Sequence, residues 1–473
     1  MVENSIMHLI NRKLDISIFV FILIASVFRV SVLFIDGDFW WQSYLGKEIL
    51  CGNFVANVHW GTLGAIDTIN YEWLSSLLFS LFSKNWYTIL FLKFILCLFV
   101  GIVNCIFLNK FSNGNKTGLC LSCLVILCTS ITCFNLKAYI FSIAFYSISI
   151  IIFYDYKENR NFLKYLLYTC ILVLLWNNLH SGSIILYFVV AALFWLCYLR
   201  DFRTLLIGFC NFLILFVNPY GYKLPLFIFT FTTERTKLFI SEWYTLDFKT
   251  LIGKIFVFLL LIGVYSISKT TYKGDLFKTS LFCLEIILCF MSTRHIMFMI
   301  TSLVLVIGCT DYKEIELASE WLKILNILNI ILLCCIIISI IFSDKKISQF
   351  SDKLKECLIE TNENDTDGLF ADATTYTLEL GIKPFISSYC LDVIDRYVDT
   401  IYIEDYSTDK EIENFIDYYG LNKFLVRKKA TYFQGYSIEP KNHLYNYLLH
   451  NEKYDIIYED DIFCYFIEVE NED

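Results

Sequence analysis

Three carboxylates stand at the edges of apolar runs, where a charged side chain is unfavourable. Asp36 and Asp38 directly follow the apolar run 15–35, and Glu72 stands at the start of a later apolar run. A charge near hydrocarbon costs about 2.5–3.5 kcal/mol on insertion scales. Carboxylates in such positions are typical of sites that do chemistry. The loop from Asp36 to Leu74 is therefore the first candidate active site.

These carboxylates could act as a general base or as metal ligands. Asp36 or Asp38 is placed to take the proton from a hydroxyl group. Glu72 could be a second carboxylate of the reaction, or it could join the two aspartates in holding Mg²⁺ or Mn²⁺ through oxygen. The alternative without chemistry is a solvated helix end for the aspartates and an ordinary helix cap for Glu72.

Cationic and polar side chains elsewhere could complete such a site. Arg294 and His295 could stabilise negative charge that develops on a leaving group. Arg29 or Lys93 could add a further cation, although Lys93 could instead pair with Glu285. The remaining candidate substrate-binding residues are Asn178, His180, Tyr220, Glu242, Trp40 and Trp41. Tryptophans suit stacking on a sugar, but they also suit anchoring at a membrane interface.

The composition predicts the elements that must hold these residues. The chain has 473 residues, 57% of them hydrophobic, and a mean hydropathy of +0.58. Runs of about 17–25 apolar residues can cross about 30 Å of hydrocarbon. We expect an α-helical polytopic membrane protein with about eleven spans, near residues 15–35, 86–108, 118–134, 139–154, 162–178, 183–199, 204–217, 251–268, 276–292, 295–309 and 321–342. The run 72–82 is too short to cross alone and is expected to lie along the interface or to lengthen the second span.

The distribution of Lys and Arg predicts the orientation. Cations concentrate in alternate connections, for example 157–164 and 200–203, and such connections face the cytoplasm. The N-terminus is therefore expected in the cytoplasm and the loop 36–85 outside. The candidate polar residues fall on the same outer side. We predict that they converge on one cavity in the outer leaflet.

The last 131 residues differ in character, because they are polar and contain no further span. Residues 343–473 are expected to form a small extracytoplasmic α/β domain after a transmembrane domain at 1–342, opening with a charged helical or linker stretch. Alternating apolar residues predict strands at Pro384–Ser388, Lys423–Val426, Tyr454–Tyr458 and Ile462–Glu468. Helical patterns occupy Asp409–Tyr419 and Lys441–His450, and Glu459-Asp460-Asp461 has the composition of a hairpin turn.

Nine short motifs follow one another along most of the chain. They are Asp36-Gly37-Asp38-Phe39-Trp40-Trp41, Gly46-Lys47-Glu48-Ile49, Asn70-Tyr71-Glu72-Trp73-Leu74, Asn178-Leu179-His180-Ser181, Asn218-Pro219-Tyr220-Gly221, Glu242-Trp243, Arg294-His295, Tyr419-Gly420-Leu421 and Tyr458-Glu459-Asp460-Asp461. In these motifs the chain resembles a largely uncharacterised bacterial family of GT-C-like multi-pass membrane glycosyltransferases, relatives of the protein mannosyltransferase and aminoarabinose transferase group. The resemblance implies a bacterial cytoplasmic membrane protein that uses a polyprenyl-phosphate sugar.

The chain departs from the family pattern at several positions. Gln42 and Tyr71 stand where the pattern has histidines, Ser181 stands for glycine, and Lys137-Ala138-Tyr139 replaces R-P-Q. If the first-loop histidines are metal ligands, their loss weakens a metal-dependent mechanism.

These observations favour an enzyme. We expect a glycosyltransferase that moves a sugar from a polyprenyl-phosphate donor in the bilayer to an extracytoplasmic glycan, lipid or protein. The alternative is a non-enzymatic membrane protein, either a transporter or flippase of lipid-linked glycan or an envelope-assembly scaffold. A transporter typically has polar groups through the full membrane depth and repeat symmetry, and neither is evident here. The net charge of −9 argues against nucleic acid as a partner.

Overall fold

The computed structural model describes residues 37–53, 56–59, 65–111, 136–230, 245–269, 275–308, 350–362, 368–371, 377–382, 384–385, 400, 402–404, 406–429 and 442–469. The chain divides into two compact units. Unit 1 comprises Met1–Phe34, Lys84–Asn218 and Thr245–Lys345. Unit 2 comprises Ile35–Ser83, Pro219–Tyr244 and Lys346–Asp473. Each unit is described below by itself.

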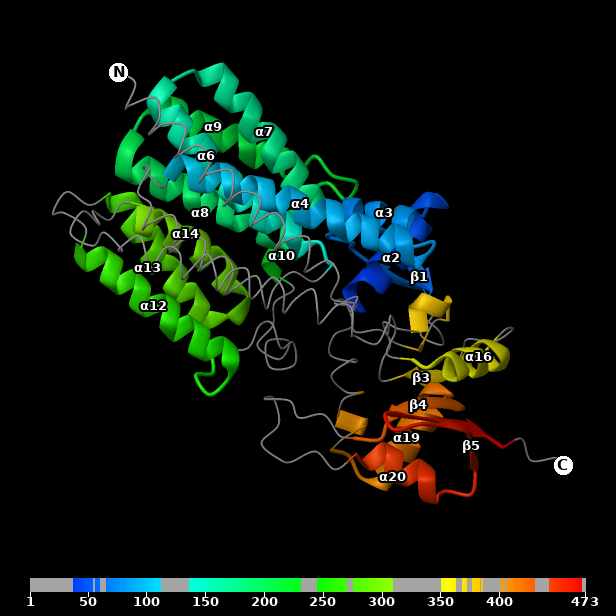
Figure 1. Ribbon diagram of the computed structural model, residues 1–473. Helices are drawn as coiled ribbons and strands as arrows, with labels where there is room; N and C mark the ends of the chain where they lie inside the picture. Colours follow the sequence, from blue (N-terminus) through cyan, green and yellow to red (C-terminus); the bar gives the residue numbers. More distant parts are fainter. Residues whose placement is uncertain are drawn as a thin grey trace. The chain divides into compact units, whose positions relative to one another are not determined.

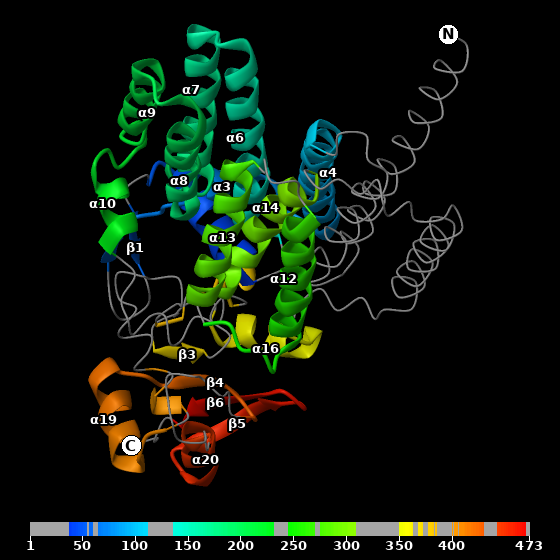
Figure 2. The same cartoon turned by 90° about the vertical axis from the view of Figure 1, so that its left-hand side faces the viewer.

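The described part of unit 1 is helical. Its helices are α4 (Trp86–Phe111), α6 (Tyr139–Asn159), α7 (Phe162–Leu179), α8 (Ile185–Phe194), α9 (Phe202–Ile214), α12 (Leu251–Lys269), α13 (Leu276–Met291) and α14 (Ile296–Gly308), with single turns at η2 (Ser181–Ser183), η3 (Trp195–Leu199) and η5 (Thr293–His295). Helix α6 contacts α4, α7, α8 and α14, and α14 also contacts α12 and α13. Figures 1 and 2 show these helices packed side by side. Helices α6 and α14 are therefore the two central helices of the described bundle.

Several of these helices match the predicted spans. Four, Tyr87–Phe111, Tyr139–Asn159, Phe162–Leu179 and Ser181–Leu199, are long and apolar enough to cross a membrane. Helices occupy all eight predicted spans that fall within the described residues, although α9, α13 and α14 are shorter than 18 residues and α8 reaches that length only together with η2 and η3. The predicted spans near 15–35, 118–134 and 321–342 lie outside the described residues, so the total of eleven stays a prediction.

Local sequence signals set the helix ends on the side with many cations. The Asn161 side chain accepts a hydrogen bond from the Lys164 backbone N–H and caps the start of α7. Asp201 caps α9 in the same way through Thr204, at 2.8 Å. Such caps satisfy backbone N–H groups that have no partner inside the helix. The two connections are consequently short and well defined.

Close helix packing in unit 1 uses a glycine. A Cβ atom on Gly263 of α12 would lie 2.2 Å from the Phe282 ring of α13. Only glycine leaves room for that ring. The buried Phe256 and Phe277 extend the apolar contact within this helical group.

The first part of unit 2 is a helix, a hairpin and a second helix. Helix α2 (Gly37–Leu50) is followed by β1 (Ala56–His59), which pairs antiparallel with β2 (Ala65–Thr68), and then by α3 (Trp73–Phe82). Helices α2 and α3 pack tightly, because a Cβ on Gly46 would lie 1.9 Å from the Ser76 carbonyl oxygen. Helix α3 ends with a cap at Ser83, so the run 72–82 forms a separate helix and does not extend α4.

The C-terminal part of unit 2 contains a four-stranded sheet. Its strands are β3 (Leu369–Ala371), β4 (Lys423–Arg427), β5 (Tyr454–Glu459) and β6 (Phe463–Glu468), in the order β3-β4-β6-β5. Strand β3 pairs parallel with β4, and the other neighbours pair antiparallel. Helices α16 (Asp352–Thr361), α19 (Asp409–Tyr419) and α20 (His443–His450) accompany the sheet, with a short turn η6 (Leu378–Leu380) that contacts α2.

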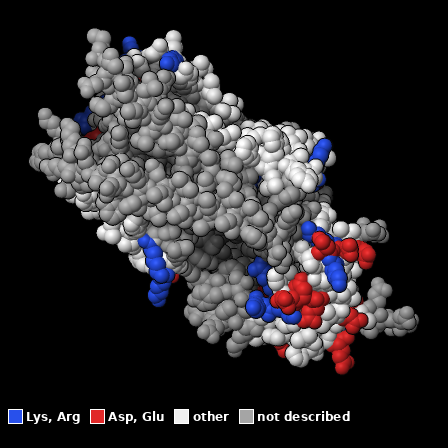
Figure 3. Space-filling view, viewed as in Figure 1, with Lys and Arg blue, Asp and Glu red and all other residues white. Residues whose placement is uncertain are grey.

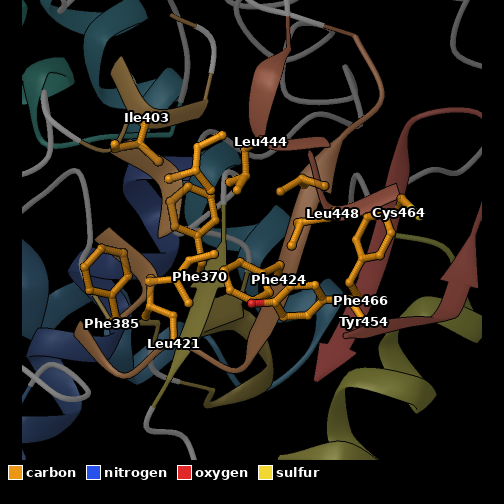
Figure 4. Close-up of a cluster of buried hydrophobic side chains, with 13 residues drawn as sticks. Phe370, Phe385, Ile403, Leu421, Phe424, Leu444, Leu448, Tyr454, Cys464 and Phe466 are labelled. Atoms are coloured by element: carbon orange, nitrogen blue, oxygen red, sulfur yellow. The ribbon is translucent and has the colours of Figure 1, made fainter. Parts of the chain in front are cut away.

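One side of this sheet carries the local hydrophobic core. Phe370, Phe424 and Phe466 from three strands meet Leu444 and Leu448 of α20, all of them buried (Figure 4). Acidic and basic side chains crowd the outer surface of this region in Figure 3, whereas the described surface of the helical bundle in that view is mostly uncharged. The C-terminal segment thus has the buried interior and charged exterior of a water-facing fold.

Most elements of this segment agree with the sequence predictions. Strands β4, β5 and β6 and helices α19 and α20 lie where the alternation and helical patterns indicated, and the β5–β6 turn lies at Asp460–Asp461. Pro384 and Phe385 are not in a strand; Phe385 instead donates its N–H to the Leu369 carbonyl, at 2.8 Å. The parallel strand at 369–371 was not predicted, because three residues are too few to show alternation. The domain boundary at 342/343 stays a prediction.

Candidate active site

The start of α2 positions one carboxylate beside two tryptophans. Asp38 is half-buried in the first turn and accepts a hydrogen bond from the Trp41 indole N–H, at 3.2 Å. Phe39 is fully buried against Phe79 of α3, with ring centroids 5.5 Å apart. The indole N–H of Trp40 is buried and has no hydrogen-bond partner among the residues that the structure describes. Packing of Phe39 therefore fixes the rotation of α2 and hence the direction of Asp38.

Glu72 is held by a residue that the sequence analysis noted only as a departure. Glu72 is buried, and its carboxylate accepts a hydrogen bond from the side-chain amide of Gln42 on α2. Asp38 and Gln42 are four residues apart and share one face of α2. The same face of one helix thus carries Asp38 and the donor that binds Glu72. A charge-assisted hydrogen bond of this kind is stronger than a neutral one.

The segment before α3 fixes Glu72 from the other side. The Asn70 side chain accepts from the Glu72 backbone N–H, at 3.1 Å, and donates to the Ser76 hydroxyl, also at 3.1 Å. Burial raises the pKa of Tyr220 to about 12, and a hydrogen bond with the Asn70 backbone partly offsets that rise. Tyr71 stacks on Phe227 of α10 (Lys223–Thr230), with centroids 6.0 Å apart. The structure therefore brings two distant motifs, around Glu72 and around Tyr220, together in unit 2.

The contacts of Asp38 and Glu72 bear directly on the predicted metal site. Among the described residues no group of three or more His, Cys, Asp and Glu side chains could hold a metal ion. Asp38 accepts from Trp41 and Glu72 accepts from Gln42, which stands at a histidine position of the family pattern. Two carboxylates already engaged by nitrogen donors do not fit a Mg²⁺ site by themselves. The third predicted ligand, Asp36, lies outside the described residues.

In unit 1, one stripe of α6 organises a second group of polar side chains. Tyr139, Ser142 and Tyr146 lie at i, i+3 and i+7, so they share a face of the helix. Tyr139 contacts Arg294, Ser142 contacts His180, and Tyr146 contacts Glu285. The Tyr139 hydroxyl donates to the Arg294 backbone carbonyl, at 2.5 Å, and the Arg294 guanidinium lies 5.2 Å from the Tyr139 ring centroid. Arg294 is thus held by both a hydrogen bond and a cation–π contact.

His180 is oriented by the middle residue of this stripe. The Ser142 hydroxyl lies 2.6 Å from His180 Nδ1 and accepts a hydrogen bond from the Trp176 indole N–H, at 2.7 Å. The Ser142 hydroxyl thus joins Trp176 and the His180 ring in one hydrogen-bonded group. Tyr139 also contacts the His180 ring edge-on, at 5.7 Å. His180 and Arg294 therefore both contact one tyrosine.

His295 lies beside a fully buried carboxylate. Glu285 of α13 accepts a hydrogen bond from the Tyr146 hydroxyl, at 2.7 Å. Its other oxygen lies 4.0 Å from His295 Nδ1, and neither of these two atoms has a hydrogen-bond partner among the described residues. Glu285 is therefore bonded to Tyr146. Of the two alternatives to substrate binding for Lys93, an ion pair with Glu285 or a bond to backbone, the ion pair is not present in the described part of the chain. Lys93 itself is buried in α4.

Asn178 has a structural role in the same unit. Its amide nitrogen donates to the Leu174 carbonyl, at 2.7 Å, and to the Val217 carbonyl, at 3.1 Å. Asn177 binds the Leu215 carbonyl in a similar way. These bonds tie the end of α7 to the chain after α9, where backbone carbonyls would otherwise lack partners.

The predicted site residues thus form two groups, one in each unit. His180, Arg294 and His295 belong to the group in unit 1, and Asp38, Glu72, Tyr220, Trp40 and Trp41 belong to the group in unit 2. Arg29, Asp36 and Glu242 lie outside the described residues. Sequence reasoning missed Gln42, Tyr139, Ser142 and Tyr146 as contacts of the site. The departures from the family motifs at Gln42 and Tyr139 were the signal that could have found two of them.

Comparison with solved structures identifies the fold. The apo crystal structure of the Archaeoglobus fulgidus oligosaccharyltransferase aligns with a TM-score of 0.57 at 11% identity, covering 87% of this chain and 69% of that one. The same enzyme with a tethered acceptor peptide containing an NVT sequon aligns with a TM-score of 0.53 at 10% identity, with the same coverage. No family model and no curated protein matches the chain. The likeness shows a GT-C-like membrane fold.

Proposed function

We propose that this chain is an integral membrane glycosyltransferase of GT-C type. It transfers a sugar from a polyprenyl-phosphate carrier to an acceptor outside the cytoplasm. The supporting observation is the fold that the chain shares with oligosaccharyltransferase structures over 87% of its length. In addition, one face of α2 carries both Asp38 and Gln42, the donor that binds the Glu72 carboxylate. A peptide is a suitable acceptor class, because one of those similar structures carries an acceptor peptide. A glycan or lipid hydroxyl would require the same base chemistry.

The carboxylates of the first loop would perform the proton transfer. Asp38, or Asp36 beside it, takes the proton of the acceptor group as its oxygen or nitrogen bonds to the anomeric carbon. The bond from that carbon to the phosphate oxygen breaks, and the polyprenyl phosphate leaves with the electron pair. Glu72, fixed by Gln42 and by the Asn70 side chain, would hold the acceptor in place.

Cationic groups would stabilise the leaving phosphate. The Arg294 guanidinium packs on the Tyr139 ring, and the Tyr139 hydroxyl bonds to the Arg294 backbone carbonyl. Together these contacts limit the movement of Arg294. The Nδ1 atom of His180 is engaged by Ser142, so its Nε2 is the atom that would donate to a phosphate oxygen. Preorganised donors of this kind act most strongly on charge that develops in the transition state.

The test compares envelope glycans and glycoproteins from cells that express variants at equal level. The variants are Asp36→Asn combined with Asp38→Asn, Glu72→Gln, and Arg294→Gln. We expect each to reproduce the altered profile of a deletion strain, with activity reduced at least 100-fold for the double aspartate variant, because loss of general-base catalysis alone costs about 10²–10⁴-fold. Mass spectrometry of the glycans and of their lipid carriers provides the readout.

Glu48→Gln is the matched control. Glu48 lies on the same helix as Asp38, and its carboxylate binds the Tyr44 hydroxyl, at 3.2 Å, and the Asn53 amide, at 2.8 Å, away from Glu72. This variant should leave the glycans unchanged. Wild-type glycans in the aspartate and Glu72 variants, with the deletion strain clearly altered, would refute the enzymatic proposal and favour a scaffold or transporter.

A further inference from the structure

Unit 1 contains a cavity whose lining includes none of the candidate active-site residues. It has a volume of about 400 Å³ and lies among α6, α7, α8 and α9. Aromatic side chains line it, including Phe153, Tyr165, Tyr187 and Trp195. Gly208 of α9 also lines it, and a Cβ on that glycine would meet no heavy atom within 4 Å. The cavity is therefore an open apolar space between helices rather than a packing defect of one side chain.

The cavity opens toward the outer surface of the bundle. Leu205 and Phe209 line it from α9, yet they are 50% and 59% exposed. The helix α9 is apolar, and its exposed residues include Phe202, Phe212 and Leu213. In a membrane, such a surface faces hydrocarbon chains. A chain from the surrounding lipid can therefore enter from the side.

Cationic side chains lie at one end of the cavity, near the aromatic rings that line it. The Arg160 guanidinium lies 5.8 Å from the centroid of Tyr156, and Lys164 Nζ lies 5.5 Å from that of Tyr165; both tyrosines line the cavity. The segments 155–164 and 200–203 carry five cations and three acids. One of the acids, Asp201, bonds to Arg160 at 2.9 Å and to Thr204. The rim therefore has an excess of positive charge.

We propose that this cavity binds an anionic phospholipid, with one acyl chain among α6–α9 and the phosphate head group at the cationic rim. Volume, apolar lining and lateral opening suit a hydrocarbon chain, and the charge of the rim suits a phosphate. The short π-helical turn η3, which carries Trp195 at the cavity wall, widens the helix at this point. The predicted orientation places this lipid in the cytoplasmic leaflet. The proposal does not depend on the proposed function.

Thermal unfolding of the purified, delipidated full chain in detergent tests this site. We expect added phosphatidylglycerol to raise the melting temperature in a saturable way, and phosphatidylcholine to raise it much less. Gly208→Leu should fill the cavity without a clash and weaken phosphatidylglycerol binding about tenfold, since the acyl chain loses space for two or three methylene groups. Lys164→Gln should reduce the preference for the anionic head group.

Leu213→Phe is the matched control, since Leu213 is an exposed apolar residue of the same helix outside the cavity lining. It should bind phosphatidylglycerol as the wild type does. Gly208→Leu without lipid should melt no lower than the wild type, because leucine is the better helix former; if it does not fold, Ala192→Leu replaces it. Equal effects of the two phospholipids, stronger binding of a polyprenyl phosphate, or full phosphatidylglycerol binding by both cavity-filling variants would overturn the proposal.

Discussion

The hydrogen bond between Gln42 and Glu72 joins two helices through one charged group. Both side chains are buried, so the carboxylate depends on this amide for much of its solvation. The other polar atom of the amide, Gln42 Oε1, is buried and has no partner within the described part of the chain. A buried donor to a carboxylate is typically worth about 1.5–3 kcal/mol. Gln42 is thus the residue on which the position of Glu72 depends most directly.

The first prediction concerns this pair. Gln42→Leu keeps the side-chain volume but removes the donor, so the Glu72 carboxylate is left without its amide partner. We expect glycosyl transfer to fall about 10–100-fold, in line with the loss of one charge-assisted hydrogen bond. The combination Gln42→Leu with Glu72→Gln should be hardly worse than Glu72→Gln alone. Additive losses in this double-mutant cycle would show that the two residues act independently.

The second prediction concerns the metal. With Gln42 at a histidine position and two carboxylates bound by nitrogen donors, wild-type protein should show no saturable rise in melting temperature with Mn²⁺ or Mg²⁺. Gln42→His supplies an imidazole beside Glu72 and Asp38, and it should produce such a rise, abolished by Asp38→Asn. A saturable Mn²⁺ effect in the wild type that needs Asp36, Asp38 and Glu72 would instead confirm the predicted metal site.

At the scale of elements, turn and cap residues determine much of the C-terminal segment. Asp460 sits in the β5–β6 turn and accepts from the backbone N–H groups of Ile462 and Phe463, each at 2.7 Å, and from the Tyr458 hydroxyl, at 2.8 Å. Partial burial tends to raise the pKa of Asp460, but these hydrogen bonds outweigh it and hold the pKa below its ordinary value. The ionised form of Asp460 therefore stabilises the hairpin.

The third prediction follows from the direction of that shift. A carboxylate with a lowered pKa in the folded state contributes stability above its unfolded pKa of about 3.9, and this contribution is lost as the pH falls through the folded pKa. Asp460→Ala should therefore cost up to about 1 kcal/mol at pH 7, since the turn is partly screened by solvent. Denaturant unfolding of the C-terminal segment in the full chain should show that this difference shrinks below about pH 4. Asp461→Ala, one position along, is the control and should have no such effect.

Elements whose residues carry a complete local signal could be predicted from sequence. Helix α19 has a capping box at Thr408 and Glu411, an apolar stripe and a glycine at Gly420, and its bounds agree with the prediction. Strand β3 has three buried residues and depends on its parallel neighbour β4, so no local pattern reveals it. The same reason hid the contact of Tyr146 with Glu285, which joins residues 139 positions apart. Sequence patterns indicate which face is polar, but not which partner that face meets.

At the scale of the whole molecule, the order of the motifs and the apolar runs predicted a GT-C-like fold, and the structural comparison supports that class at a level where identity is only 11%. The length of each apolar run can be read directly from the sequence, because every spanning helix must by itself be long enough to cross the hydrocarbon and must pair its own backbone polar groups. Whether the two residue groups come together cannot be read from the sequence in the same way. The groups belong to different units, and a sequence pattern within one unit carries no information about the other.

The fourth prediction concerns orientation, on which that convergence depends. If Lys and Arg direct the topology, the cationic connections at 157–164 and 200–203 face the cytoplasm, and the acidic loop and the C-terminal segment face outward. Fusions of alkaline phosphatase after residue 345 and after residue 473 should then be active, and fusions after residue 160 should be inactive. Green fluorescent protein at the same three positions should give the opposite pattern, since it matures only in the cytoplasm. An active phosphatase at residue 160 with fluorescence at residue 345 would invert the molecule, place the carboxylates of Asp38 and Glu72 inside the cell, and exclude an extracytoplasmic acceptor.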